Sequence, residues 1–266
     1  MYTGVEDGLA DGPCMKGVSL SCSGPPVDRG AWMLVRHSRT RGLIIILGLL
    51  IVGVAGTAIL DVIGWDLDWV SRFYTPGGAR GGWTHGREQP WGFLYDYGEI
   101  PAFILAAAAL ALYVTVKLGR ARRQYAKSCL VVILTVALGP GLLVTCILKP
   151  YWSRPRPADI TAMGGTQEYH KVWMPAGVQG GKSFPCGHCS MGFSLASGAA
   201  FYPFHPVLSV CALAGGIAYG MLLGATRIIQ GGHFPTDVLW AGILMLMLIA
   251  TLYYLVLRVP EQTDSS

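Results

Sequence analysis

Three groups of polar residues have the types and spacing to carry out chemistry on a phosphorus atom. The first is Arg227-x5-His233-x3-Asp237. An imidazole four residues before a carboxylate can act as a nucleophile, because the carboxylate fixes the tautomer of the ring through its second nitrogen. The upstream guanidinium would bind the oxygens of the group under attack. This spacing predicts that His233 attacks phosphorus while Asp237 orients it.

The second group, Lys149-x6-Arg156-Pro157, would supply more positive charge to the same site. Lys149, Arg156 and Arg227 would hold the non-bridging oxygens of the phosphate, the arginines as planar forks and the lysine as a point charge. They would also stabilise the negative charge of the transition state. We therefore expect an anion site at which three cations converge.

The third group is Pro185-Cys186-Gly187-His188. His188 would start protonated, donate a proton to the leaving oxygen, and then accept one from the hydrolytic water. Cys186 and Gly187 would turn backbone N–H groups and the positive end of a helix towards the phosphate. No group of residues has the spacing of metal ligands, so we expect neither a metal nor another cofactor.

The elements that would position these groups are membrane spans. Hydrophobic residues make up 52% of the 266 residues, and charged residues only 13%. Four uncharged runs of about 20 residues match the thickness of a bilayer core; they cover 42–60, 128–148, 206–226 and 238–257. Two shorter runs, 100–116 and 189–204, reach that length only with their flanks. The sequence predicts an all-α, polytopic membrane protein with six transmembrane helices.

The net charge of +5 follows this topology and is no sign of nucleic-acid binding. Arginines precede the first run, five cations fill residues 117–127, and Arg258 follows the last run. The positive-inside rule then predicts that both termini are cytoplasmic, with the three groups at the outer face of the membrane. Arg154 fits none of the roles above, and we interpret it as an interfacial charge.

Residues 41–258 are expected to form one membrane domain, between a flexible tail of residues 1–40 and a short tail of residues 259–266. The N-terminal tail, which contains Cys14 and Cys22, is not expected to be a signal peptide. Residues 61–99 are rich in aromatic side chains, and 66–74 could form a short interfacial helix. This loop would be either an anchor in the headgroup region or a wall of a lipid-substrate groove.

Small residues recur at intervals of four in two of the runs. They are Gly192, Ala196 and Ala200 in one run, and Gly216, Gly220 and Gly224 in the next. Such spacing puts a flat face on a helix and lets neighbouring backbones approach closely. We expect these two segments to pack together and to hold their polar groups near each other.

The three groups together resemble the signature of the type 2 phosphatidic acid phosphatase superfamily, which includes bacterial acid phosphatases and vanadium haloperoxidases. Its pattern is Lys-x6-Arg-Pro, Pro-Ser-Gly-His and Ser-Arg-x5-His-x3-Asp, matched here over residues 149–237. The resemblance implies that the protein dephosphorylates a lipid phosphate or diphosphate through a phosphohistidine. Within the superfamily, the residues around His188 and His233 are most similar to the bacterial lipid A phosphatase branch.

Two positions depart from the family pattern. Thr226 replaces a serine but keeps a hydroxyl, whereas Cys186 replaces a serine with a weak thiol donor. Cys186 and Cys189 also form a CxxC pair at the predicted helix start. The pair either fills the small-residue positions as thiols or closes into a disulfide in an oxidising compartment. A thiol oxidoreductase would need a thioredoxin-like context, which this chain lacks.

The sequence leaves the substrate and part of the reaction open. A lipid phosphotransferase could use the same histidine, and an anion transporter could use the same cations. The candidate substrates are a phosphate of lipid A, phosphatidylglycerol phosphate, undecaprenyl diphosphate and phosphatidic acid. The expected partners are this lipid and the bilayer, with no nucleic acid and no obligate protein partner.

Overall fold

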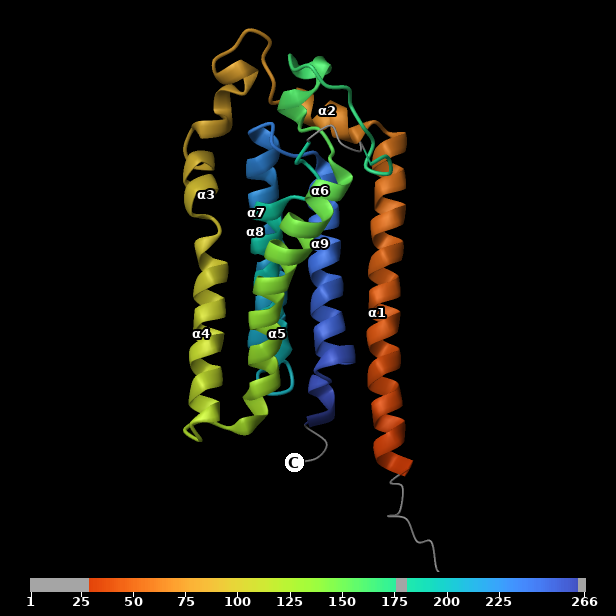
Figure 1. The fold of residues 1–266 in the computed structure, drawn as a ribbon, viewed down its shortest axis with the longest axis vertical. Coiled ribbons are helices and arrows are strands. Elements are labelled where there is room, and N and C mark those ends of the chain that lie inside the picture. Colours follow the sequence, from red (N-terminus) through yellow and green to blue (C-terminus); the bar gives the residue numbers. More distant parts are fainter. Residues whose placement is uncertain (1–28, 176–180, 263–266) are drawn as a thin grey trace, which may run out of the picture.

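The computed structural model describes residues 29–175 and 181–262, and these residues are mostly helical. Their only strand-like pairing is an isolated bridge between Ile160 and Gln167. Figure 1 shows a bundle of long helices. The long elements are α1 (Arg29–Val62), α4 (Ile100–Lys117), α5 (Ala126–Val136) with its continuations η4 (Ala137–Leu148) and α6 (Lys149–Trp152), α8 (Pro206–Ile229), and α9 (Pro235–Ala250) with η8 (Thr251–Val256).

Shorter helices connect the long ones. They are α2 (Trp65–Ser71), η1 (Arg80–Gly82), η2 (Thr84–Arg87), α3 (Trp91–Tyr97), η3 (Arg123–Tyr125), η5 (Pro157–Asp159), η6 (Thr161–Met163), α7 (Gly187–Ser194), η7 (Leu195–Phe201) and η9 (Val259–Gln262). The helix α2 confirms the short helix predicted within residues 66–74. Helix α1 begins at Arg29 and so includes residues 29–40 of the predicted tail. Cys14 and Cys22 lie outside the described residues.

Five stretches of the described residues are long and apolar enough to cross a membrane, namely Ser38–Val62, Trp91–Lys117, Arg123–Asp159, Pro206–Ile229 and Pro235–Glu261. Five of the six predicted spans thus coincide with helices of spanning length and composition. The sixth predicted run, 189–204, forms α7 and η7, which pack among α5, α8 and α9. Three serines of this segment, Ser190, Ser194 and Ser197, are buried, as suits a helix surrounded by protein rather than by lipid.

Apolar side chains cover the outside of the bundle. Large exposed hydrophobic residues line α1, α4 and α8, among them Leu43, Ile44, Leu47, Ile51, Phe103, Ile104, Val207, Leu208 and Met221. Soluble proteins rarely expose contiguous apolar surface on this scale. These faces therefore suit the hydrocarbon of a bilayer, and the chain is an integral membrane protein.

The predicted stripes of small residues do pack together. A Cβ on Gly192 of α7 would lie 2.7 Å from the Cα of Gly220 on α8, and Gly216 is equally close to Ala196. Without side chains at these contacts, the two backbones touch. Because α7 starts and α8 ends at the same end of the bundle, this packing brings His188 near the end of α8.

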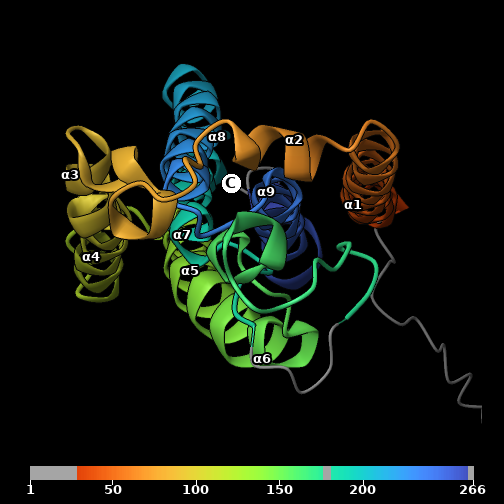
Figure 2. The ribbon, with the colours of Figure 1, turned by 90° about the horizontal axis from the view of Figure 1, so that it is seen from above.

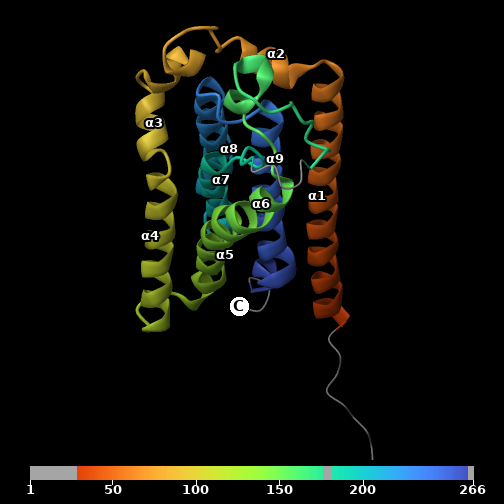
Figure 3. The same cartoon turned by 45° about the horizontal axis from the view of Figure 1, so that its top comes forward.

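The two ends of the bundle differ in what they carry. The start of α1, the loop between α4 and α5, and the last helical turns lie at one end (Figure 1). The short helices α2 and α3 lie at the other end, where α2 follows α1 in the chain and packs against α9 (Figure 2). The segment after α6 runs over this end towards α1 (Figure 3), where Lys171 pairs with Asp61 at 2.9 Å. All three predicted polar groups lie at this second end.

Candidate active site at one end of the bundle

Helix ends position the predicted site residues. Lys149 begins α6, Gly187 and His188 begin α7, and Arg227 lies in the last turn of α8. Pro235 is the first residue of α9, as the sequence predicted, so Asp237 lies in its first turn. The connection between α8 and α9 is short, residues 230–234, and contains His233.

His233 and Asp237 are both almost completely buried, at 2% and 0% exposure. Nδ1 of His233 lies 3.7 Å from Oδ2 of Asp237, which is too long for a hydrogen bond. Oδ2 instead accepts hydrogen bonds from the Ser183 hydroxyl at 2.6 Å and from the Phe234 N–H at 2.8 Å. The predicted hydrogen bond is therefore not formed here, but the carboxylate still faces Nδ1.

Electrostatics favour the neutral form of His233. Burial lowers its pKa to about 4, although the Asp237 carboxylate opposes this shift. The cations Arg227 and Lys149 lower the pKa further. At neutral pH the ring is therefore uncharged, which is the form that a nucleophilic imidazole requires.

Arg154 has a role that the sequence analysis missed. Its side chain is fully buried, with Nη1 2.6 Å from Oδ1 of Asp237 and Nη2 2.8 Å from Oδ2 of Asp66. The interpretation of Arg154 as an interfacial charge is wrong, because its side chain is buried between two carboxylates from distant parts of the chain. The guanidinium compensates the buried charge of Asp237 and fixes the position of this carboxylate.

Asp66 connects α2 to the start of α9. It is 5% exposed, and its carboxylate accepts hydrogen bonds from the backbone N–H of Thr236 at 3.0 Å and from its hydroxyl at 2.6 Å. An acidic side chain at a helix N-terminus satisfies a free N–H and complements the helix dipole. Arg154 also donates to the carbonyl of His170 at 2.8 Å. This buried network holds the first turn of α9, and with it Asp237, in place.

The three predicted phosphate-binding cations lack acidic partners. Among the described residues, no ion pair includes Lys149, Arg156 or Arg227. They are close enough for their charges to repel one another. The Nε atoms of Arg156 and Arg227 are buried without a hydrogen-bond partner in the described part of the chain. Buried donors without partners are costly, so this arrangement is suited to an anion.

Tyr95 and Glu99 position His188 from one side. The rings of Tyr95 and His188 stack with centroids 5.0 Å apart, and Nδ1 of His188 lies 3.4 Å from Oε1 of Glu99. The guanidinium of Arg227 lies 4.7 Å from the Tyr95 ring. Burial lowers the pKa of His188 below its usual value, and Glu99 opposes the shift. Part of the aromatic loop 61–99 thus forms a wall of the site.

Cys186 and Cys189 form a disulfide across the first turn of α7. Cys186 is completely buried, and its backbone N–H donates to the Asp237 carbonyl at 3.4 Å. No thiol is therefore available at this position for a phosphate. Gly187 lies beside the cations, because a Cβ there would be 3.2 Å from Nζ of Lys149. The absence of a side chain keeps this approach open.

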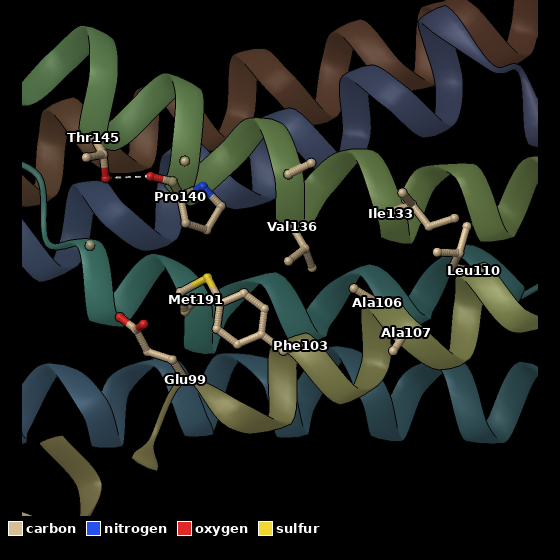
Figure 4. Close-up of a pocket in the computed structure, with 13 residues that line it drawn as sticks. Glu99, Phe103, Ala106, Ala107, Leu110, Ile133, Val136, Pro140, Thr145 and Met191 are labelled. Atoms are coloured by element: carbon tan, nitrogen blue, oxygen red, sulfur yellow. Dashed lines mark hydrogen bonds between the residues drawn. The ribbon is translucent and has the colours of Figure 1, made fainter. Parts of the chain in front are cut away.

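An apolar groove of about 560 Å³ leads away from the site between α4 and the α5–η4 helix (Figure 4). Glu99 and Gly187 lie at its polar end, and Phe103, Leu110, Val136 and Met191 line its walls. Where the groove passes Pro140, α5 has widened into η4, and the Thr145 hydroxyl donates to the Pro140 carbonyl at 2.8 Å. The groove therefore joins the cationic site to the region that faces lipid.

Known proteins resemble this chain in sequence. The family model of the PAP2 superfamily matches residues 124–260. The chain is 28% identical over 228 residues to a protein of Francisella tularensis subsp. novicida named lipid A 4'-phosphatase, over 82% of this chain and 97% of that relative. It is 30% identical over 132 residues to a Rhizobium leguminosarum protein with the same name, over 49% and 56% of the two chains. No solved structure gives a significant match. The family match covers more than half of the chain and all three groups, so this protein belongs to the PAP2 superfamily and is a membrane-embedded phosphatase.

Proposed function

We propose that this protein hydrolyses a phosphate group from a membrane lipid and that His233 carries the phosphoryl group between the two steps. The observation that carries this proposal is the contrast in charge around His233. Arg154 is neutralised by two carboxylates, whereas Lys149, Arg156 and Arg227 have no acidic partner among the described residues. A phosphate would supply the missing negative charge next to a neutral imidazole.

In the first step, Nε2 of His233 attacks phosphorus, and the bond between phosphorus and the lipid oxygen breaks. His188 gives its proton to that oxygen, so the lipid leaves as an alcohol. The three cations bind the phosphoryl oxygens and stabilise their charge in the transition state. Asp237, held by Arg154 and Ser183, stabilises the positive charge that develops on the His233 ring.

In the second step, a water molecule attacks the phosphohistidine. His188 takes a proton from this water as its oxygen bonds to phosphorus, and the bond between phosphorus and Nε2 breaks. Inorganic phosphate leaves, His233 returns to its neutral form, and His188 is protonated again. No step requires a metal ion, because the cations of the chain provide the positive charge.

A lipid substrate fits the shape of the surroundings. The apolar groove ends at Glu99 and Gly187, so a lipid could place an acyl chain between α4 and η4 with its phosphate beside His233. We propose a phosphate of lipid A as the substrate, because two relatives are named lipid A 4'-phosphatase. The first of them aligns over 97% of its own length.

We also propose that the site faces the periplasm and that both termini are cytoplasmic. The cation-rich loop between α4 and α5 lies at the same end as the start of α1, opposite the site (Figure 1). By the positive-inside rule, that end is cytoplasmic.

The test is phosphate release by detergent-purified protein from lipid A, phosphatidylglycerol phosphate, undecaprenyl diphosphate and phosphatidic acid. We expect lipid A to be hydrolysed with the highest kcat/KM, and the His233→Ala variant to be inactive on all four. A higher kcat/KM for another of these lipids would contradict the proposal that lipid A is the substrate. Retained turnover by the variant would contradict the mechanism.

A further inference from the structure

A second cationic pocket adjoins the site on the far side of Arg227. It has a volume of about 300 Å³, and Arg80, Arg87 and Arg227 all line it, together with Trp83, Tyr95 and Gln230. This volume equals that of about ten water molecules in the liquid. The mechanism uses only Arg227 of these three arginines, so the chemistry of the reaction leaves Arg80 and Arg87 unexplained.

The ion pairs of the described residues balance the charge of this pocket only in part. Arg87 pairs with the exposed carboxylate of Asp96 at 3.2 Å, but the described ion pairs give Arg80 and Arg227 no acidic partner. The charges of Arg87 and Arg227 repel each other. A bound anion would therefore stabilise three guanidinium groups around one small pocket.

Two of the residues that line the pocket carry buried donors without a partner in the described part of the chain. The indole Nε1 of Trp83 and the Nε of Arg227 are buried without a hydrogen-bond acceptor in the described residues. Trp83 is only 6% exposed, so water does not freely reach its ring. Buried N–H groups of this kind are normally satisfied by protein, water or ligand.

The floor of the pocket is held in place by Gln230. Its Oε1 accepts a hydrogen bond from Arg227, and its Nε2 donates to the Gly86 carbonyl at 2.8 Å. A Cβ on Gly86 would lie 3.1 Å from the Cα of Gln230, so the loop and the end of α8 are in tight contact. Arg87 packs over the Tyr95 ring at 4.5 Å. The loop that carries Arg87 is thus fixed against the catalytic centre.

We propose that this pocket binds a second phosphate group of the same substrate lipid, and this inference rests on the proposed function. Arg227 would then contact both phosphates, one at His233 and one between Arg80 and Arg87. The enzyme would recognise a headgroup that carries two phosphates and would bind a singly phosphorylated headgroup more weakly. Arg80 and Arg87 would be specificity-determining residues that take no part in the chemical steps.

The test compares diphosphoryl lipid A with monophosphoryl lipid A that retains the 4'-phosphate, and mass spectrometry follows the loss of one phosphate from each. Wild-type protein should show a KM about tenfold lower for the diphosphoryl lipid, which corresponds to about 1.4 kcal/mol of binding. Arg80→Gln should remove this difference by raising the KM for the diphosphoryl lipid alone. Arg80→Lys should restore part of it. Arg72→Gln is the matched control, because Arg72 is an exposed arginine that pairs with Asp68 outside the pocket.

Other outcomes would overturn the proposal. Equal KM values for the two lipids in wild-type protein would show that the pocket does not bind a second phosphate. An equal effect of Arg80→Gln on both KM values would show the same. Inorganic phosphate that inhibits wild-type protein but not Arg80→Gln, with equal KM values, would assign the pocket to the free product instead. In those cases phosphate is still released, so the proposed function survives. Failure of wild-type protein to hydrolyse either lipid would contradict both proposals.

Discussion

Arg154 and Arg156 are two residues apart, yet the structure predicts opposite effects when their charges are removed. The Arg154→Met variant should have a lower unfolding temperature (Tm) than wild-type protein. The Arg156→Met variant should keep the fold and lose activity. Methionine keeps much of the length and removes every donor. The pair therefore separates a charge that stabilises the fold from a charge that binds the phosphate.

The magnitude for Arg154 follows from its partners. Its guanidinium is fully buried between Asp66 and Asp237, so the substitution leaves two carboxylates without a counter-charge. Removing one partner of a buried ion pair costs about 3–5 kcal/mol. In a domain of this size, 1 kcal/mol shifts the unfolding midpoint by about 2–4 °C. We expect Tm to fall by roughly 10 °C.

Arg156 pairs with no carboxylate of the described residues, and its charge repels Lys149 and Arg227. The Tm of Arg156→Met should stay the same or rise slightly. Its rate of phosphate release should fall by about 10²–10³-fold, the usual cost of removing one donor to a transition-state oxyanion.

The assay is tryptophan fluorescence during heating in detergent, combined with phosphate release at 25 °C. A double variant, Arg154→Met with Asp66→Asn, should recover part of the lost Tm, because it removes one of the two unpaired carboxylates. An unchanged Tm for Arg154→Met would refute the assigned role of the buried network. Equal Tm losses for both single variants would refute the distinction between the two arginines.

Three further predictions concern pH, redox state and topology. As the pH increases, kcat/KM should rise at about pH 4, where His233 loses its proton. It should fall at higher pH as His188 loses its proton, and this fall should be centred below the usual histidine pKa of about 6.5. A rate still rising at pH 8 would contradict these roles. Dithiothreitol should change phosphate release by less than about tenfold, or 1.4 kcal/mol, because backbone hydrogen bonds also hold the start of α7; a larger change that is absent from Cys189→Ala would show that the disulfide is needed. A membrane-impermeant maleimide added to the periplasmic side should label Lys182→Cys and not Arg120→Cys, and the reverse pattern would invert the proposed orientation.

The sequence predicted the spans and the members of the site because both signals are local. An uncharged run of about 20 residues matches the bilayer wherever it occurs, and five of the predicted runs lie in helices long and apolar enough to cross it. The polar groups flank these runs, so their convergence at one end followed from the order of the spans. The sixth predicted run, residues 189–204, forms α7 and η7 and is not among these five stretches. It differs in its buried serines, which are a sign of contact with protein that the hydrophobicity of the run concealed.

Long-range partners could not be predicted in the same way. Arg154 and Arg156 look alike in the sequence, and only the contact of Arg154 with Asp66 on α2 separates them. One usable signal was Asp66 itself, since an acidic residue in an aromatic interfacial helix needs a partner. The positions of Tyr95, Glu99 and Ser183 carried no such signal. They depend on how the loops fold over the end of the bundle.

In the proposed mechanism, His233 becomes phosphorylated during turnover. The most direct measurement uses lipid A labelled with ³²P on the phosphate that is removed, mixed rapidly with the protein and quenched in alkaline detergent. We predict a protein-bound label that is stable to base, is lost in acid and maps to the peptide containing His233. The same label should be absent from His233→Ala, whose turnover should be reduced by about 10³-fold or more. Turnover by wild-type protein with no label on His233, together with a His233→Ala variant that still releases phosphate, would contradict the mechanism.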